Sequence, residues 1–212
     1  MEMEKEFIQV QLGLFFKTDF LGMPETASLS MKEQFGENIN SQILGVPANA
    51  PSEIPRVIVN SDFVNINLAK NRIDFFSKDK LFLISNFEKI FNIVNKLSVN
   101  IGRVGVVFTY FKEGEVEELK KIFDQSKVSS LNPKDISFRF NEEKNISGIM
   151  SNNSQMYVSG FVDDGRGGKK KGIIITRDIN SLQEDINKNN FNKETLNKFI
   201  LDVIVEAEKS LI

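Results

Sequence analysis

The chain contains neither cysteine nor histidine among its 212 residues. Without cysteine it can form no disulfide, no thiolate nucleophile and no cysteine-ligated zinc or iron–sulfur centre. Without histidine it lacks the commonest general base and transition-metal ligand. The two absences exclude Ser-His-Asp and Cys-His catalysis. No other catalytic motif is evident, so we predict a protein that is not an enzyme and has no cofactor and no metal site.

The chain also has no large excess of one charge, because 27 Lys and Arg residues and 29 Asp and Glu residues give a formal net charge of -2. The basic footprint of a typical nucleic-acid-binding protein is therefore absent. No uninterrupted apolar run approaches the ~18 residues that span a bilayer, and MEMEKEFIQV lacks the apolar core of a signal peptide. We expect a cytoplasmic protein with no membrane partner. Heavy use of Asn, Ile and Lys favours a bacterial or phage origin.

One order of elements, strand, helix, several short strands, helix, occurs twice along the chain. The first copy covers residues 6–97 and the second covers residues 101–211. Each copy favours an antiparallel sheet with helices packed on one face. We therefore predict an α+β protein of two tandem lobes, residues 1–98 and 99–212, that share one continuous sheet or core. No residue-level repeat between the halves is evident.

In the first lobe, apolar residues alternate with mostly polar or small residues over positions 6–17, which is typical of a strand. An apolar residue then recurs at every fourth position and predicts a helix that begins near Ser30 and ends before Gly45. The residues of this series are Met31, Phe35, Ile39 and Ile43. Short strands are predicted over residues 56–60, 63–69 and 72–77, and a helix with three-and-four apolar spacing over residues 85–97.

In the second lobe, residues 101–111 are apolar at nearly every position, which is typical of a central strand. A helix over 114–125 and a final helix over 193–211 have apolar residues at helical spacing. Between them we predict strands over residues 135–141, 146–151, 155–162 and 172–177. Loops are expected at residues 142–145 and 152–154, followed by a long Gly-rich tip.

The Gly-rich tip, residues 163–172, is the local sequence with the most evident chemical potential. Glycine backbone amides and four cations could cradle a phosphate. The segment lacks the P-loop order G-x-x-x-x-G-K-[ST] and lies between two strands, whereas a P-loop precedes a helix. A solvated hairpin tip is the simpler interpretation. The residues of the possible anion-binding loop are Gly165, Arg166, Gly167, Gly168, Lys169, Lys170 and Lys171.

Phenylalanine accounts for most aromatic residues, with 19 Phe, 2 Tyr and no Trp. Adjacent rings on a strand, such as Phe15 and Phe16, must point to opposite faces of the sheet. If helices cover one face, the other rings lie on an open face. The predicted open face collects Gln9, Gln11, Phe15, Asn65, Asn67, Arg103, Thr109, Ser137, Arg139, Tyr157, Ser159 and Phe161. The residues expected to bind a partner are Phe15, Asn65, Asn67, Arg103, Arg139, Tyr157 and Phe161.

Uncharged polar groups, aromatic rings and arginines are typical of a recognition surface. We favour a non-catalytic role in which this face binds a protein partner or a second copy of the chain. In an alternative, nucleic acid binds, with rings against bases and basic side chains on phosphates. A further alternative is a small-ligand or phosphate site. A half-exposed sheet without a partner is the simplest interpretation.

The tandem order of elements resembles the TATA-binding-protein-like fold, whose two halves form a saddle with helices on the convex side. That resemblance implies an open sheet face able to bind nucleic acid. Three short motifs are also similar to a sporadically distributed family of uncharacterised bacterial proteins. They are AP-x-EIPR at residues 50–56, RVGVVF at residues 103–108 and RDI at residues 177–179. The second resemblance implies no catalytic residues.

Overall fold

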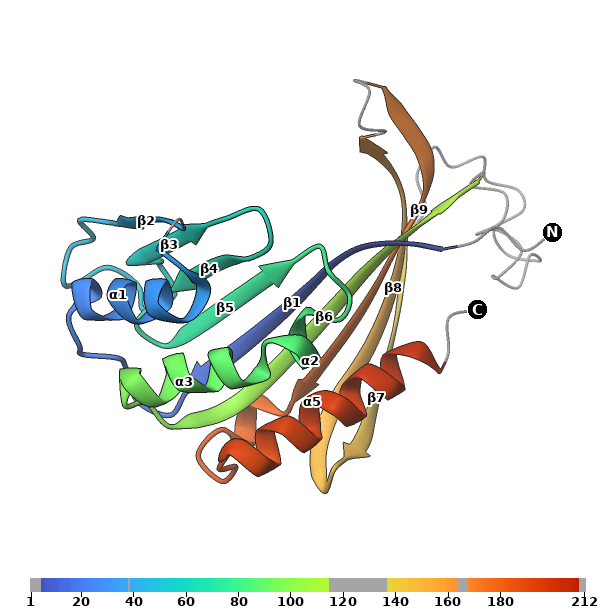
Figure 1. The fold of residues 1–212 in the computed structure, drawn as a ribbon. Coiled ribbons are helices and arrows are strands. Elements are labelled where there is room, and N and C mark those ends of the chain that lie inside the picture. Colours follow the sequence, from blue (N-terminus) through green and yellow to red (C-terminus); the bar gives the residue numbers. More distant parts are fainter. Residues whose placement is uncertain (1–4, 38, 115–136, 164–167, 210–212) are drawn as a thin grey trace.

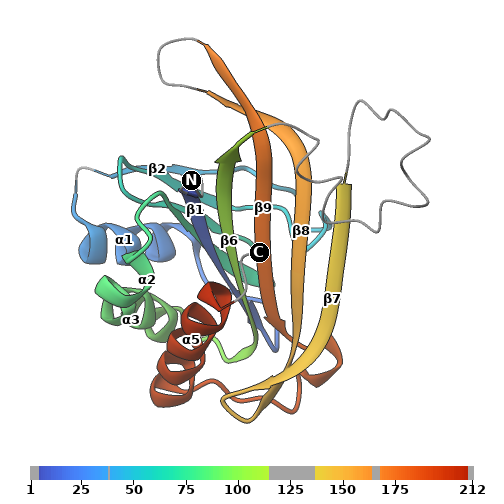
Figure 2. The same cartoon turned by 90° about the vertical axis from the view of Figure 1, so that its right-hand side faces the viewer.

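The computed structural model describes residues 5–37, 39–114, 137–163 and 168–209. Within these ranges, nine strands form one antiparallel sheet in the order β2-β3-β4-β5-β1-β6-β9-β8-β7. The helices all lie on one face of this sheet (Figures 1 and 2). The predicted α+β class, an antiparallel sheet with helices on one face, is confirmed. No helix of the described part is long and apolar enough to cross a membrane.

The strands are β1 (Glu6–Phe16), β2 (Asn40–Ile43), β3 (Val57–Asn60), β4 (Asn65–Leu68), β5 (Arg72–Ser77), β6 (Ile101–Glu113), β7 (Ser137–Ile146), β8 (Ile149–Asp163) and β9 (Lys169–Ser181). The helices are α1 (Pro24–Phe35), α2 (Phe82–Ser85), α3 (Phe87–Leu97) and α5 (Lys193–Glu208), with one 3₁₀ turn, η1 (Gln183–Asp185).

Strand β1 shows why one face of the sheet forms the core. Leu12 is fully buried, and the register places it opposite Phe75 of β5 and Val106 of β6, which are also fully buried. Because side chains alternate along a strand, Gln11 and Phe15 point to the other face. Burial of an aliphatic or aromatic side chain of this size stabilises the fold by about 1.5–3 kcal/mol. The helices therefore pack on the even-numbered face of β1.

The strand order is the same on both sides of the central β1–β6 pair. Each central strand is flanked by the last strand of its own half, β5 or β9, and then by the preceding strands in reverse order. Gly13 of β1 lies directly opposite Gly105 of β6. The segments LGLFF (residues 12–16) and VGVVF (residues 104–108) therefore occupy equivalent positions. The register thus reveals a short residue-level correspondence that the sequence alone does not single out.

Helix α1 differs from its prediction. It begins at Pro24 rather than near Ser30, and a proline is favourable at the first position of a helix. It ends before Gly36, whose φ of 102° is accessible mainly to glycine. The predicted extension to Ile43 is wrong, because residues near Ile43 instead form the edge strand β2, which pairs with β3.

The strands from residue 137 onward are longer than the sequence predicts. The expected loops at 142–145 and 152–154 are wrong, because β7 and β8 pair continuously through both. The turn between them lies at Ser147 and Gly148, with φ of 54° and 84°, as in two-residue hairpin turns. The helix predicted over 114–125 lies outside the described residues apart from Gly114. The predicted terminal helix corresponds to α5.

Candidate recognition face on the sheet

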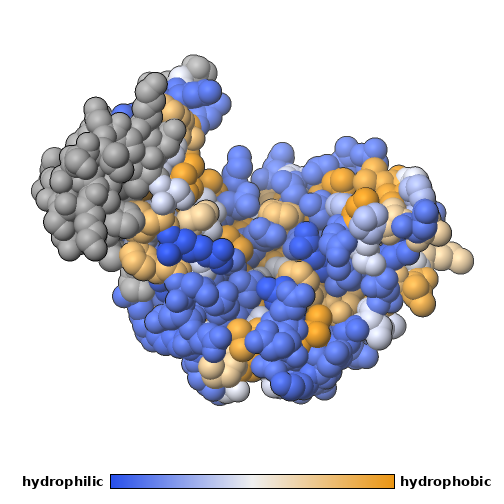
Figure 3. Space-filling model, turned by 180° about the vertical axis from the view of Figure 1, so that it is seen from behind, coloured by the Kyte–Doolittle hydropathy of each residue, from blue (hydrophilic) through white to orange (hydrophobic). Residues whose placement is uncertain are grey.

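The face of the sheet opposite the helices carries the candidate site. Figure 3 shows the molecule from behind relative to Figure 1, the side away from the helices. The visible coloured surface is mostly hydrophilic, with apolar spots that are separated by polar side chains. Such a surface offers hydrogen bonds and charges to a partner rather than one large apolar contact.

Phe15 lies between two arginines on the neighbouring strands. It pairs with Arg72 of β5 and with Arg103 of β6. The guanidinium carbon of Arg72 lies 5.6 Å from the ring centroid of Phe15, and that of Arg103 lies 4.5 Å from it. These distances are typical of cation–π contacts. Arg103 Nε also donates to the Ser181 carbonyl at 3.1 Å. This Arg–Phe–Arg row is therefore held in place within the protein.

Asp74 of β5 is a carboxylate on the same face and is only 4% exposed. Its Oδ2 lies 2.9 Å from Arg72 Nε, and its Oδ1 accepts from Gln11 Nε2 at 3.3 Å. Burial raises the pKa of Asp74 above its ordinary value, although the charge of Arg72 and the hydrogen bond from Gln11 act in the opposite direction. Gly13 leaves room for this carboxylate, because a Cβ at Gly13 would lie 3.0 Å from Oδ1.

The other half of the sheet has a comparable arrangement over Gly105. A Cβ at Gly105 would come within 2.4 Å of Asn180 Oδ1, so this amide occupies the space above the glycine. Asn180 Nδ2 donates to Asp178 Oδ1 at 2.5 Å. Burial raises the pKa of Asp178, while the hydrogen bond from Asn180 and the charges of Arg139 and Arg103 lower it.

Positive and negative side chains are interspersed across this face from β5 to β7. The residues in question are Asp74, Arg72, Arg103, Asp178 and Arg139. A charged carboxylate that is partly removed from water is unfavourable for folding. Groups whose pKa is shifted in this way cluster at functional sites. We therefore define the recognition face as the Arg–Phe–Arg row together with Asp74, Asp178, Asn180 and Arg139.

The structure places most of the predicted partner-binding residues on this open face. The strand pairings place five of them there: Phe15, Asn65, Asn67, Arg103 and Arg139. Asn65 also lines a small pocket of about 270 Å³ at the end of β4 and β5. The open face therefore extends from this pocket to the edge strand β7.

Tyr157 and Phe161 lie on the opposite, helix-bearing face. Tyr157 pairs with Phe138 and Ile175, is 1% exposed, and stacks on Phe138 with ring centroids 4.8 Å apart. The prediction that Tyr157 lies on the open face is therefore wrong. Phe161 lies four residues after Tyr157 on the same strand, so its side chain points to the same face as that of Tyr157 and not to the open face. It is nevertheless 60% exposed. Ser159 lies two residues after Tyr157 and points to the same face, so the prediction that Ser159 lies on the open face is also wrong.

Several residues of the recognition face are not predicted from the sequence. Arg72 and Asp74 flank Ile73, and Asp178 and Asn180 flank Ile179. In both cases the central isoleucine is fully buried, so the polar residues on either side must face the other way. This polar–apolar–polar pattern on a strand is the signal that could have identified them.

The possible anion-binding loop is only partly described. Gly165, Arg166 and Gly167 lie outside the described residues. The three lysines are exposed residues of β9, on a hairpin that projects beyond the rest of the sheet (Figure 1). Because strand side chains alternate, Lys170 points away from the side shared by Lys169 and Lys171. The three ammonium groups therefore do not converge on one face of the hairpin.

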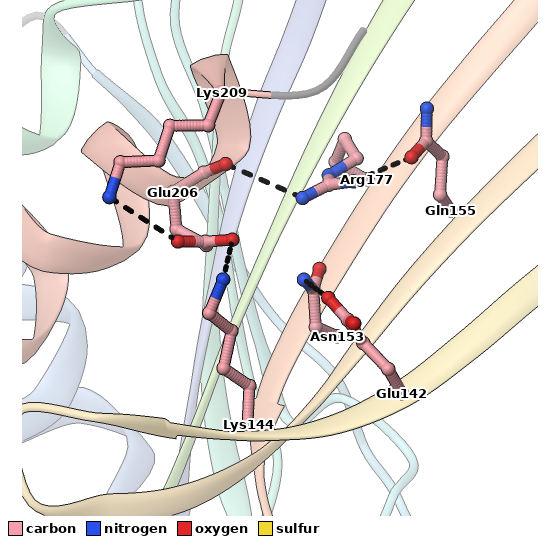
Figure 4. Close-up of polar contacts among 7 residues, drawn as sticks. All are labelled: Glu142, Lys144, Asn153, Gln155, Arg177, Glu206 and Lys209. Atoms are coloured by element: carbon pink, nitrogen blue, oxygen red, sulfur yellow. Dashed lines mark hydrogen bonds and ion pairs between the residues drawn. The ribbon is translucent and has the colours of Figure 1, made fainter. Parts of the chain in front are cut away.

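A second polar cluster lies beneath α5, on the helix-bearing face (Figure 4). Arg177 is 3% exposed and donates to Gln155 Oε1 at 2.6 Å and to the Glu206 backbone oxygen at 3.4 Å. The Glu206 carboxylate accepts from Lys144 Nζ at 2.6 Å and lies 3.7 Å from Lys209 Nζ. These contacts join α5 to β7, β8 and β9, and we interpret the cluster as structural.

No protein-family model and no curated protein matches the chain. Among the described residues, no three acidic side chains form a group that could hold a metal ion.

The two partly buried aspartates make a testable prediction about stability and pH. Since each folded pKa is raised, the folded state binds protons more tightly than the unfolded state, and stability rises as the pH falls through the raised pKa. Acidification from neutral pH to about pH 4.5 should therefore favour the wild type relative to a D74N/D178N variant. Urea unfolding at both pH values, with exposed Asp62→Asn as control, measures this difference. Identical pH dependence in all three proteins would contradict it.

Proposed function

We propose that the protein is a non-catalytic recognition protein that binds a protein partner through the open sheet face. The observation that carries this proposal is the Arg–Phe–Arg row beside two desolvated carboxylates, on a face that no described helix covers. Arginine and aromatic residues supply much of the binding energy at protein interfaces. Side chains already ordered within the protein also lose less entropy on binding.

The presence of both charges on this face favours a protein over nucleic acid. A base that stacks on Phe15 would have to displace the guanidinium groups that now lie near its ring. Asp74 and Asp178 would repel phosphates placed over the same face. A protein can present both signs of charge. A second copy of the chain is the first such partner to test, because a self-complementary patch can form a two-fold interface.

The test compares two matched double variants. Phe15→Ser with Arg103→Glu alters the recognition face, whereas Val205→Ser with Lys198→Glu makes the same kinds of change on the exposed side of α5. We expect the first variant to weaken partner binding by about 30-fold or more and the second to leave it unchanged. Light scattering measures self-association, and quantitative capture from the native host measures binding of another protein.

Two outcomes would contradict this proposal. One is that the wild type and both variants show the same mass and capture the same proteins in equal amounts. The other is retention on nucleic acid at low salt that falls steeply as salt is added and is lost in the first variant. That second result would assign the face to nucleic acid, as the saddle resemblance implies.

A further inference from the structure

A groove at one end of the helix layer is separate from the recognition face. It lies between the loop that follows β1, the first turns of α1 and the end of α3. These segments lie together at one end of the fold in Figure 1. The groove has a volume of about 510 Å³. Pockets that bind small organic molecules typically have volumes of roughly 300–1,000 Å³.

The first turn of α1 faces this groove without a side-chain cap. Met23 is the N-cap residue, and its side chain makes no capping hydrogen bond. Thr26, in the first turn, lines the groove. The N–H groups at the start of a helix have no intrahelical acceptor, and the helix dipole makes this end attractive to anions. The helix has 12 residues, and the carboxylate of its first turn, that of Glu25, is exposed and does not line the groove.

A buried hydroxyl in the same groove supplies an independent observation. Ser30 lines the groove, is only 4% exposed, and its Oγ has no hydrogen-bond partner within the described structure. An unpaired buried polar group disfavours the folded state. A ligand oxygen that pairs with this hydroxyl would offset part of that effect.

The other residues that line the groove include apolar, basic and acidic side chains. Leu21 is 89% exposed and Met23 is 71% exposed, while Leu97 is buried at 7%. Lys96 also lines the groove and pairs with Glu33. The carboxylate in the wall, Asp19, accepts from Ser52 Oγ at 3.0 Å. The groove therefore combines an anion-attracting helix end with an apolar surface.

We propose that this groove binds a small amphipathic organic anion. Its charged group contacts the first turn of α1 and the Ser30 hydroxyl, and its apolar part lies against Leu21, Met23 and Leu97. The proposal is independent of the open face, because none of the groove residues belongs to that face.

Octanoate, neutral octanamide and inorganic phosphate are suitable probes for the full-length protein. Titration followed by amide NMR should show saturable octanoate binding, with the largest shifts at Thr26 and Ser30. Octanamide and phosphate should each bind at least about tenfold more weakly, since each lacks one of the two recognised features. Saturable binding at a different place, equal affinity for octanamide, or no saturation would each overturn the proposal.

A variant at the helix cap separates ligand loss from unfolding. Met23→Asp supplies an internal cap and a negative charge where the ligand anion would sit, so it should stabilise α1 and yet weaken octanoate binding at least about tenfold. Met23→Leu should keep the affinity, and Ser30→Ala should lower it a few-fold without loss of fold. Unchanged octanoate affinity in Met23→Asp would overturn the assignment of the anion position.

Discussion

Replacement of Gly102 by alanine is expected to lower the free energy of unfolding by about 3 kcal/mol. A Cβ at Gly102 would lie 2.1 Å from the backbone oxygen of Ile186, 2.7 Å from its Cγ1 and 2.8 Å from Lys17 Cγ. A backbone oxygen cannot rotate away as a side chain can. The segment between β9 and α5 would therefore have to move away from β6, with loss of the hydrogen bond from Phe191 N to the Ile101 carbonyl.

Gly45→Ala is the matched control for this substitution. A Cβ at Gly45 would meet no heavy atom within 4 Å, and its backbone is not in the left-handed region. We expect a change within about 0.5 kcal/mol for the control. Urea unfolding of the wild type and both variants gives the comparison. A loss below about 1 kcal/mol in Gly102→Ala would show that the Ile186 segment is not packed against β6 as described.

Arg177→Met is expected to destabilise the protein by about 2–3 kcal/mol. The methionine keeps much of the apolar stem but removes the donors to Gln155 Oε1 and to the Glu206 carbonyl. The glutamine oxygen and a carbonyl near the end of α5 would then be buried without these partners. Loss of the cation also removes a favourable charge near the negative C-terminal end of the helix. Thermal or urea unfolding measures the loss.

A double-mutant cycle tests whether this cost comes from the polar pair. Gln155→Met alone leaves Arg177 without one acceptor, whereas the Arg177→Met/Gln155→Met variant removes both members. We expect the double variant to be more stable than the sum of the single losses predicts, by about 1 kcal/mol. Strict additivity would show that Arg177 stabilises α5 through contacts other than the one with Gln155.

Much of the fold follows from alternation and helical spacing. The strands around Ile66 and Ile73, the strand over 101–111 and the helix around Ile90 all lie where the apolar pattern predicts them. In these segments the local pattern and the tertiary packing agree. Periodicity fails where two patterns overlap, as at Ile39 and Ile43, which continue a helical spacing beyond the glycine that ends α1.

The β7–β8 hairpin shows how strand pairing overrides turn propensity. Runs rich in Asn and Ser near Asn145 and Asn152 predict turns, yet both segments form ladder pairs between β7 and β8. The actual turn needs two residues at positive φ, which Ser147 and Gly148 adopt. A composition rule cannot choose among several Asn- and Ser-rich positions, because the register of the partner strand decides.

The recognition face is only partly visible in the sequence for a related reason. Phe15 and Arg103 lie on strands whose apolar faces are clear, so their orientation can be predicted. Tyr157 lies on a strand where both faces carry polar residues, because Gln155 and Asn153 are buried on the helix-bearing face. Because polar residues of this strand are also buried, the polarity of a residue does not indicate which face of the sheet its side chain occupies.

The central position of β1 has a consequence for how the chain is made. This strand is synthesised before its neighbours β5 and β6, so Gly13 can pair with Asp74 on one edge and with Gly105 on the other only after those strands are made. During translation β1 is therefore an apolar strand with two unpaired edges, which can template wrong pairing. The order of synthesis thus exposes a strand that lies in the middle of the finished sheet, so β1 is where misassembly of the nascent protein would begin.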